Sequence, residues 1–396
     1  MKREDFGPNT WLVEQLYRQY QENPSSVSEA WQEFFEDYQP PADGEAKRVR
    51  AEAPAKPAPR VPENAVALTG ANKVIAQRMG ESLGVPTATS FRTVPAKLLE
   101  INRSILNNHL ERSRGGKVSF THLIGYAVVR ALAEQPGMNV SYAEVDGAPH
   151  AVRHPHVHLG LAVDVTKDDG GRTLLVPNIK EAETLDFAGF FRAYEELIRK
   201  VRDGKISPDD FAGTTVTITN PGMIGTVQSV PRLMPGQAAI IGVGSIGYPA
   251  EYAGADPEAL AEMGIGKVLT LTSTYDHRVI QGAESGELLR RVEGLLLGRD
   301  ELYDGIFASM HVPYVAVEWR QDVNPQEETL DAHEKEARVY QLINMYRVRG
   351  HLIANLDPLE AEPPQMHPEL DPAFFGFTIW TSTAGSRPAV SPASGR

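Results

Sequence analysis

Cysteine is absent from the 396 residues of this chain, which excludes disulfides, iron–sulfur clusters, cysteine-ligated zinc and a cysteine nucleophile. No apolar run reaches the roughly 18 residues of a transmembrane helix, and the stretch MKREDFGPNTW lacks the apolar core of a signal peptide. Positive charge is scarce too, because 39 Lys and Arg oppose 52 Asp and Glu. This balance argues against nucleic acid and anionic membranes as partners. We therefore expect a cytoplasmic protein.

The beginning of the chain divides into a helical segment, residues 1–38, and a Pro- and Ala-rich linker, residues 39–64. The apolar periodicity of the first segment predicts two short helices, the second with Trp31 and Phe35 on its apolar side. So few residues cannot bury this aromatic surface alone. The segment either docks on another protein or packs against its own main domain. The linker composition predicts an extended spacer.

Residues 65–300 contain both helix and strand patterns, as expected of a globular domain. Helical periodicity is found at 71–83, 95–112, 120–139 and 184–203. Strand patterns are found at 87–94, at 213–220 and in HVHLGLAVDV, TLLVPNI, QAAIIGVGSI and KVLTLTST. Because strands and helices do not alternate regularly, we expect an α+β fold, a large mixed sheet with helices packed on one face. Residues 301–380 are predicted to be mainly helical, and 381–396 to be a disordered tail.

The stretch GVGSIG, residues 242–247, matches the glycine pattern of dinucleotide-binding folds. Such a fold needs an amphipathic helix that begins at the last glycines. Here YPAEYAGADPE follows instead, with Pro249 and Pro257. A sheet strand in which glycines allow close packing fits the sequence better. A nicotinamide-dependent oxidoreductase is accordingly a weak alternative.

Three histidines alternate in the stretch RHPHVHLG. His154, His156 and His158 would share one face of a strand, and three imidazoles on one face can bind zinc or nickel. No carboxylate motif accompanies them, and Pro155 suggests a sheet edge. We favour solvated or hydrogen-bonded histidines and predict no metal site.

Four polar side chains in a row, Tyr275, Asp276, His277 and Arg278, separate a predicted strand at 267–275 from an apolar helix. Desolvating such groups costs several kcal/mol, on the order of 2–7 for a neutral polar group, unless they are paired. An ion pair between Asp276 and Arg278 that only holds the corner is one interpretation. A catalytic histidine presented to a cleft is the other.

Thr219 favours the second interpretation, that of a catalytic histidine. Its hydroxyl lies at the end of the predicted strand at 213–220, directly before the glycine-rich turn NPGMIG. A histidine base and a hydroxyl donor together are a minimal set for acyl transfer without a protein nucleophile. We therefore take His277 and Thr219 as candidate catalytic residues.

The stretches around these residues resemble the acyltransferase component of 2-oxo acid dehydrogenase complexes. That family carries DHRxxDG, and a strand ending in TISN or TITN. This chain has DHRVIQG at 276–282 and TITN at 217–220. The similarity extends over residues 65–300, including LGLAVDV, TLLVPNIKEAETL and GQAAIIGVG. It implies a fold like that of chloramphenicol acetyltransferase, a mixed sheet with packed helices.

Both flanks resemble a different enzyme. NTWLVEQLYRQY near the N-terminus is similar to the start of the 2-oxoglutarate dehydrogenase component, and YRVRGHLIANLDPLE to the helical region before its thiamine-diphosphate core. An acyltransferase domain between such pieces resembles a family of fused actinobacterial enzymes of 2-oxoglutarate metabolism. The resemblance implies helical dehydrogenase-derived segments at 1–38 and 301–380.

The sequence departs from the family in three places. Gln281 stands where most members have the Asp that pairs with the arginine, although the fused enzymes are similar to this chain here. No lipoyl-bearing lysine motif is found, so the acyl group is expected on the lipoyl arm of another protein. The thiamine motif GDG…NN is absent, and the resemblance ends after Trp380. The chain resembles a truncated form of the fused enzymes. Thiamine diphosphate, Mg and decarboxylase activity are therefore expected only of full-length members of that family.

The resemblance implies transfer of a succinyl group between a dihydrolipoyl thioester and coenzyme A, within a 2-oxoglutarate dehydrogenase complex of the tricarboxylic acid cycle. His277 would be the general base, Thr219 the donor to the oxyanion, and Asp276, Arg278 and Gln281 supporting residues. His277 and Thr219 would come from different subunits of a homotrimer.

The expected partners are a lipoyl-bearing acyltransferase subunit and dihydrolipoyl dehydrogenase. The alternative is a non-catalytic assembly scaffold of the same complex.

Overall fold

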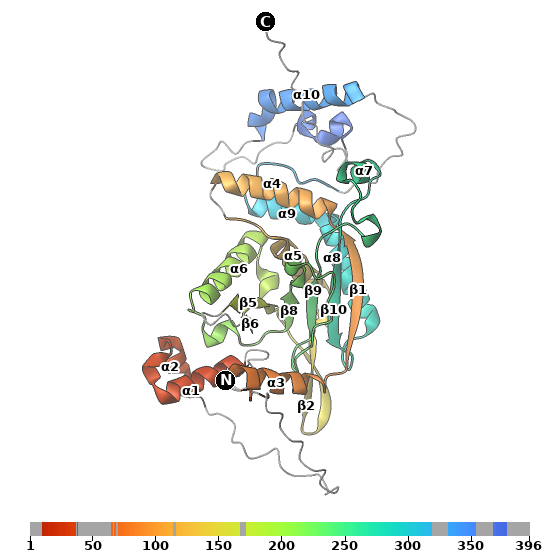
Figure 1. Ribbon diagram of the computed structural model, residues 1–396. Helices are drawn as coiled ribbons and strands as arrows, with labels where there is room; N and C mark the ends of the chain where they lie inside the picture. The colour runs from red at the N-terminus through yellow and green to blue at the C-terminus, as the bar shows by residue number, and fades with distance from the viewer. Residues whose placement is uncertain are drawn as a thin grey trace.

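The computed structural model describes residues 10–36, 38, 65, 67–68, 70–113, 116–166, 172–318, 332–353 and 367–377. The whole predicted linker, residues 39–64, and the whole predicted tail, residues 381–396, lie outside these residues. Figure 1 shows a central sheet with helices packed around it, a helical N-terminal part below and helix α10 above. Among the described residues, no helix combines the length and the apolar character that crossing a membrane requires.

The central element is a mixed sheet of six strands. Its order is β1-β10-β9-β8-β4-β7. Neighbouring strands are parallel in the β9/β8 and β8/β4 pairs and antiparallel in the other three. The strands are β1 (Thr87–Pro95), β10 (Val268–Asp276), β9 (Ala239–Val243), β8 (Val216–Thr219), β4 (Leu159–Leu161) and β7 (Asn178–Ile179). The expected α+β class with a mixed sheet is confirmed.

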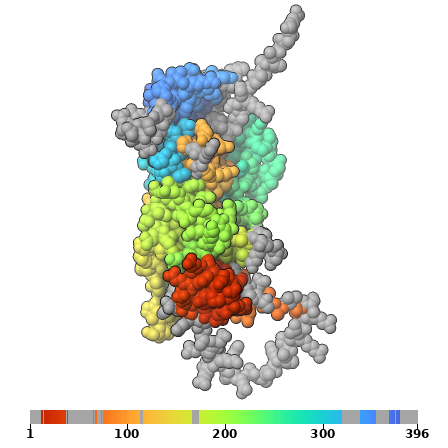
Figure 2. Space-filling model, turned by 90° about the vertical axis from the view of Figure 1, so that its left-hand side faces the viewer, coloured from red at the N-terminus to blue at the C-terminus, as the bar shows by residue number. Residues whose placement is uncertain are grey.

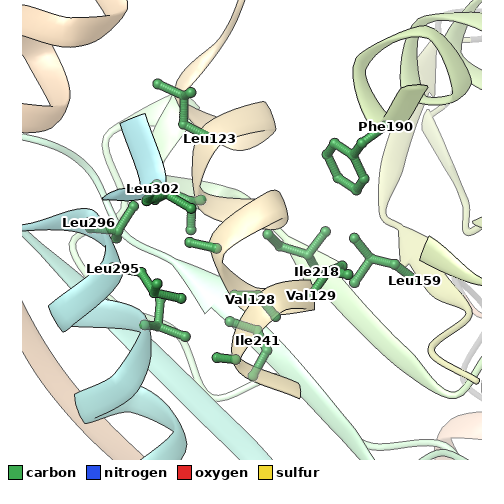
Figure 3. Packing of buried hydrophobic residues seen from close by; sticks show 14 of the residues in the cluster. Leu123, Val128, Val129, Leu159, Phe190, Ile218, Ile241, Leu295, Leu296 and Leu302 are labelled. Carbon is green, nitrogen blue, oxygen red and sulfur yellow. The ribbon is translucent and has the colours of Figure 1, made fainter. Parts of the chain in front are cut away.

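Helices cover one face of this sheet and bury its apolar side chains. Figure 3 shows the core, where Val128 of α5 and Leu295 of α8 lie close to Ile218 and Ile241 of the sheet. The helices that contribute to this core are α4 (Lys97–Ser113), α5 (Phe120–Glu134), α6 (Phe187–Arg202), α8 (Gly282–Leu296) and α9 (Leu302–Ser309), whereas the short helix α7 (Pro257–Glu262) lies outside it. α9 contributes buried residues to the same core, so the packed unit continues beyond residue 300.

Strand alternation gives the opposite face of the sheet a different chemistry. Along β10, Leu269 and Leu271 belong to the apolar core, whereas Thr272 and Thr274 project to the other side. The hydroxyl of Thr274 is 2.8 Å from that of Thr89 on β1. Buried hydroxyl groups therefore lie on the face of the sheet that points away from the apolar core.

Two predicted strands are each split by the structure. HVHLGLAVDV supplies β4 to the central sheet and β5 (Val163–Thr166) to a separate hairpin with β6 (Arg172–Leu175). The break is at Ala162, whose backbone N–H still donates to Ile218 of β8 at 3.0 Å. TLLVPNI divides in the same way between β6 and β7. The apolar pattern continues through both breaks and gives no sign of them.

A hairpin of β2 (Val140–Val145) and β3 (Ala148–Arg153) was missing from the sequence prediction. Asp146 and Gly147 form its turn, with φ values of 52° and 75°. Such left-handed turns favour Asp-Gly in two-residue hairpins. The local signal was therefore present, although the flanking residues are not strongly apolar.

The N-terminal helices α1 (Thr10–Glu22) and α2 (Glu29–Glu36) pack against the chain's own main domain, close to α3 (Gly70–Ser82) (Figures 1 and 2). Trp31 is 3% exposed, and its indole Nε1 donates to the carbonyl of Ile206 at 3.1 Å. Phe35 joins the same cluster, which includes Leu175 of β6 and Val201 of α6. Of the two interpretations of this segment, packing on the main domain is the one observed.

The C-terminal described part contains α10 (Ala332–Arg349) and short helical turns at 367–377. Arg349 of α10 forms an ion pair with Glu369, and Arg338 donates to the carbonyl of Phe375 at 3.4 Å. These contacts hold the two stretches to each other. The helical character predicted for this region is present in the described residues.

Candidate active site

His277 occupies the corner where β10 ends and α8 begins. Its backbone N–H donates to the carbonyl of Pro86 at 2.9 Å, which ties the corner to the start of β1. Its ring Nδ1 lies 3.0 Å from the carbonyl oxygen of Ile280. Because a carbonyl can only accept, Nδ1 carries the hydrogen in the neutral ring and Nε2 keeps a free lone pair. The side chain is exposed, so this lone pair is available to a substrate.

Asp276 and Arg278 form the ion pair expected from the sequence. Arg278 Nε donates to Asp276 Oδ1 at 2.9 Å and Nη2 donates to Oδ2 at 2.6 Å. The Asp276 side chain is 4% exposed, and a carboxylate buried to this extent needs such a partner. The pKa of Arg278 is raised above its ordinary value, mainly because the guanidinium donates hydrogen bonds to Asp276. The pair fixes the backbone on both sides of His277.

Gln281 lies at the N-cap of α8 and is exposed. Its backbone N–H donates to Glu284 Oε2 at 2.8 Å. No hydrogen bond joins its side chain to Arg278 within the described part of the chain. Its observed role is to begin the helix.

Thr219 is the last residue of β8 and is half-buried. The next residue, Asn220, donates from Nδ2 to Thr121 Oγ1 of α5 at 2.7 Å. In the turn that follows, Gly222 lies against the backbone of Gly244, and a Cβ on Gly222 would be 2.3 Å from its carbonyl carbon. A larger residue cannot occupy this position, so the glycines fix the path of the chain after Thr219.

One chain does not bring Thr219 and His277 together. Thr219 pairs with Gly242 of β9, which pairs with Thr272 of β10. Asp276 lies four residues further along β10, about 13 Å at the usual rise per residue, and two strand spacings add about 10 Å sideways. The two candidate residues are therefore about 15 Å or more apart. Thr219 ends β8, whereas His277 follows the end of β10, which runs in the opposite direction to β8.

The three alternating histidines have separate partners, and residues 154–158 lie between β3 and β4 rather than in one strand. His154 Nε2 is 2.9 Å from the Ser141 hydroxyl, and His156 Nδ1 is 2.7 Å from Glu183 Oε1. His158 Nδ1 accepts from the backbone N–H of Glu181 at 3.0 Å. The prediction of hydrogen-bonded histidines is confirmed, and their common strand face is wrong. In the described ranges, no three His, Asp or Glu side chains are grouped to hold a metal ion.

The glycines of GVGSIG serve packing. A Cβ on Gly242 would lie 2.4 Å from Thr272 Oγ1, and one on Gly244 would clash with the carbonyl of Val227. No helix begins at Gly247, because α7 starts ten residues later at Pro257. The close-packed strand predicted for this stretch is confirmed, and the helix of a dinucleotide site is missing from this described region.

Two features of the site were not found from the sequence. Tyr142 of β2 stacks on Arg278, whose Cζ is 3.6 Å from the ring centroid. An apolar loop follows Thr219, in which Met223 and Ile224 are 81% and 76% exposed. Val227 and Val230 of the same loop are also exposed. The interrupted apolar run MIGTVQSV is a sequence signal for this loop, whereas the Tyr142 contact has none.

Two solved structures are similar to this chain in fold and in sequence. The cubic core of the pyruvate dehydrogenase multienzyme complex matches with a TM-score of 0.51 and 28% identity, over 66% of this chain and 100% of the other. Dihydrolipoamide acetyltransferase of Azotobacter vinelandii matches with a TM-score of 0.50 at the same identity and coverage. The family described as 2-oxoacid dehydrogenases acyltransferase (catalytic domain) matches residues 61–303. The chain belongs to this family.

Curated relatives extend the similarity to both flanks. The multifunctional 2-oxoglutarate metabolism enzyme of Mycobacterium sp. (strain JLS) is 44% identical over 95% of this chain. The enzyme of the same name from Mycolicibacterium vanbaalenii is 46% identical over 95% of the chain. The chain spans about a third of their length, 35% and 34%. Residues 6–42 match the family described as 2-oxoglutarate dehydrogenase N-terminus.

Proposed function

We propose that this chain transfers a succinyl group between coenzyme A and a dihydrolipoyl thiol. His277 is the general base and Thr219 the oxyanion donor. The observation that carries the proposal is the exposed His277 ring, whose Nδ1 lies 3.0 Å from the Ile280 carbonyl oxygen and so leaves Nε2 without a hydrogen in the neutral ring. This is the tautomer and exposure that a base at a substrate channel requires.

The reaction begins with a thiol that is mostly protonated at neutral pH, since cysteine itself has a pKa of about 8.5. His277 Nε2 takes the proton from the coenzyme A thiol, and the sulfur attacks the succinyl carbonyl of the dihydrolipoyl thioester. The Thr219 hydroxyl donates to the oxyanion. The intermediate then expels the dihydrolipoyl sulfur, which receives the proton from the imidazolium. General-base assistance of this kind contributes roughly 10²–10⁴ in rate.

A second copy of the chain completes the site. Because Thr219 is about 15 Å or more from His277 in one chain, Thr219 serves the His277 of a neighbouring subunit. The exposed apolar loop with Met223 and Ile224 begins four residues after Thr219. Exposed apolar patches of this kind mark protein–protein contacts. A homotrimer, as the family resemblance implies, places this loop between subunits.

The succinyl substrate rests on the relatives rather than on the site. The two curated enzymes, from Mycobacterium and Mycolicibacterium, are named for 2-oxoglutarate metabolism, and oxidative decarboxylation of 2-oxoglutarate yields a succinyl group. The acyl group arrives on a lipoyl arm of another protein. Dihydrolipoyl dehydrogenase then reoxidises the dihydrolipoyl group within the complex of the tricarboxylic acid cycle.

The test is the rate of succinyl transfer from succinyl-CoA to dihydrolipoamide. His277→Ala is expected to lower the rate on the order of a thousandfold. His351→Ala, an exposed histidine far along the chain, is the matched control and should leave it unchanged. Acetyl-CoA in the same assay measures acyl preference. A folded trimer without turnover in the unmodified chain would favour the assembly scaffold instead.

A further inference from the structure

An aromatic ring of the β2–β3 hairpin contacts the corner between β10 and α8 that contains His277. Tyr142 lies on β2, and its ring faces the guanidinium of Arg278 with Cζ 3.6 Å from the centroid. A guanidinium at this distance is attracted by the negative face of the ring. The contact joins two parts of the chain that are 136 residues apart in sequence.

The base of the hairpin holds Tyr142 in place. Its neighbour Ser141 is 3% exposed, with its hydroxyl 2.9 Å from His154 Nε2. Asn139, also 3% exposed, donates from Nδ2 to the carbonyl of His156 at 2.8 Å. These bonds fasten the start of β2 to the segment that follows β3. Tyr142 therefore projects from a supported position, although the far end of the hairpin is exposed.

Asp276 and Tyr142 contact different parts of the Arg278 guanidinium, so both contacts form at the same time. Asp276 binds the edge of the guanidinium through Nε and Nη2, and Tyr142 covers its face. Arginine suits this arrangement, since its flat, weakly hydrated group forms bidentate hydrogen bonds and stacks at the same time. Gln281, which replaces the second carboxylate of related sequences, supplies no charge here. The ring of Tyr142 takes over part of that restraint.

We propose that Tyr142 is a positioning residue for His277 and acts through Arg278. The inference rests on the proposed acyl transfer. His277 is bonded directly to Arg278, so movement of the guanidinium turns the peptide that carries the imidazole. With the ring removed, Arg278 keeps its bidentate bond to Asp276 but loses the contact on the face of its guanidinium. Nε2 then spends less time where the thiol binds, while the substrate-binding surfaces are unchanged.

The experiment compares Tyr142→Leu, Tyr142→Phe, Arg278→Met and the Tyr142→Leu/Arg278→Met double variant in the full chain. Tyr142→Leu is expected to lower kcat for succinyl transfer about fivefold to tenfold, the effect of losing a partly buried cation–π contact. The KM values for both substrates should stay the same. Tyr142→Phe keeps the ring and should restore most of kcat. Val145→Ala, exposed on the same strand, is the control for general damage to the hairpin.

The double variant decides whether the effect passes through Arg278. In the Arg278→Met background, Tyr142→Leu should change kcat less than twofold, because the contact is already absent. An equal loss in both backgrounds would overturn the inference, as would Tyr142→Leu with the kcat of the unmodified chain. No turnover in the unmodified chain would instead overturn the proposed function and this role with it.

Discussion

Thr219 ends β8 in one row of paired residues with Gly242 and Thr272, whereas His277 follows the end of β10, five residues beyond Thr272. Each residue is held firmly within its own chain, Thr219 by the packed turn after β8 and His277 by the Pro86 and Ile280 carbonyls. The geometry is that of two half-sites. The proposed acyl transfer therefore requires Thr219 of one copy to lie against His277 of another.

Mixing two inactive variants tests this arrangement. Thr219→Ala and His277→Ala each remove one half-site, so homotrimers of either should have little activity. In trimers assembled from equal amounts of both, about one site in four combines an intact Thr219 with an intact His277 from the neighbour. Co-expression should therefore recover about a quarter of the activity of the unmodified protein. No recovery in mixed trimers of confirmed composition would show that both residues act within one chain.

The ion pair between Asp276 and Arg278 should contribute measurably to stability. Asp276→Asn removes the charge from a side chain that is 4% exposed and leaves Arg278 without its edge partner. We expect a loss of about 2 kcal/mol in the free energy of unfolding, less than for a fully buried pair because Arg278 is partly exposed. Urea denaturation measures it.

The control for this variant is Glu81→Gln. It breaks an exposed pair with Arg78 on α3, and such pairs contribute about 0.5 kcal/mol or less. Equal losses for the two variants would contradict the view that the corner pair is special.

Sequence patterns were sufficient where a residue's environment is set by its near neighbours. The apolar and β-branched patterns predicted the strands β8 and β10, and the polar run at the end of β10 gave an Asp276–Arg278 pair as one of two interpretations. Both follow from the two-residue period of strands and the cost of burying an unpaired charge.

Contacts between residues far apart in the sequence could not be predicted from local patterns. The break between β4 and β5 lies at Ala162, whose N–H still donates to Ile218 of β8, and no local feature of the sequence indicates it. The stacking of Tyr142 on Arg278 joins a hairpin that was itself missed. The separation of Thr219 from His277 depends on the strand order, in which β9 lies between β8 and β10. Sequence alone suggested two subunits through resemblance, not through geometry.

Trp31 is expected to hold the N-terminal helices on the main domain. Trp31→Ala removes a large buried side chain and its bond to the Ile206 carbonyl, a change that typically costs 3–5 kcal/mol, here expected at about 3. The helices should detach, and limited proteolysis should cleave within residues 1–38 faster than in the unmodified chain. Trp31→Phe keeps the ring contacts, so its rate of cleavage should lie between that of Trp31→Ala and that of the unmodified chain. Succinyl transfer should be unaffected, because the cluster lies outside the corner and the β8 turn. Unchanged cleavage in Trp31→Ala would mean that the other aromatic residues suffice.

His122 should make stability depend on pH. It is 2% exposed at the start of α5, among Phe191 and Tyr194, and burial lowers its pKa to about 4. Glu195 Oε1 is 3.3 Å from Nε2, but this carboxylate is half-exposed and does not offset the burial. Nδ1 accepts from the Ser119 N–H at 2.9 Å, which also requires an unprotonated ring nitrogen.

Because the folded-state pKa is below the unfolded value of about 6.5, only the unfolded chain takes up a proton between these values. The stability that neutral His122 provides is complete above pH 6.5 and decreases as the pH falls toward 4, by about 3 kcal/mol. His122→Gln can still accept from the cap but does not titrate. Urea unfolding between pH 7 and 4.5 should show a decrease that is about 2 kcal/mol smaller in the variant. Parallel curves for the two proteins would show that the imidazole becomes protonated without unfolding, with Glu195 as its partner.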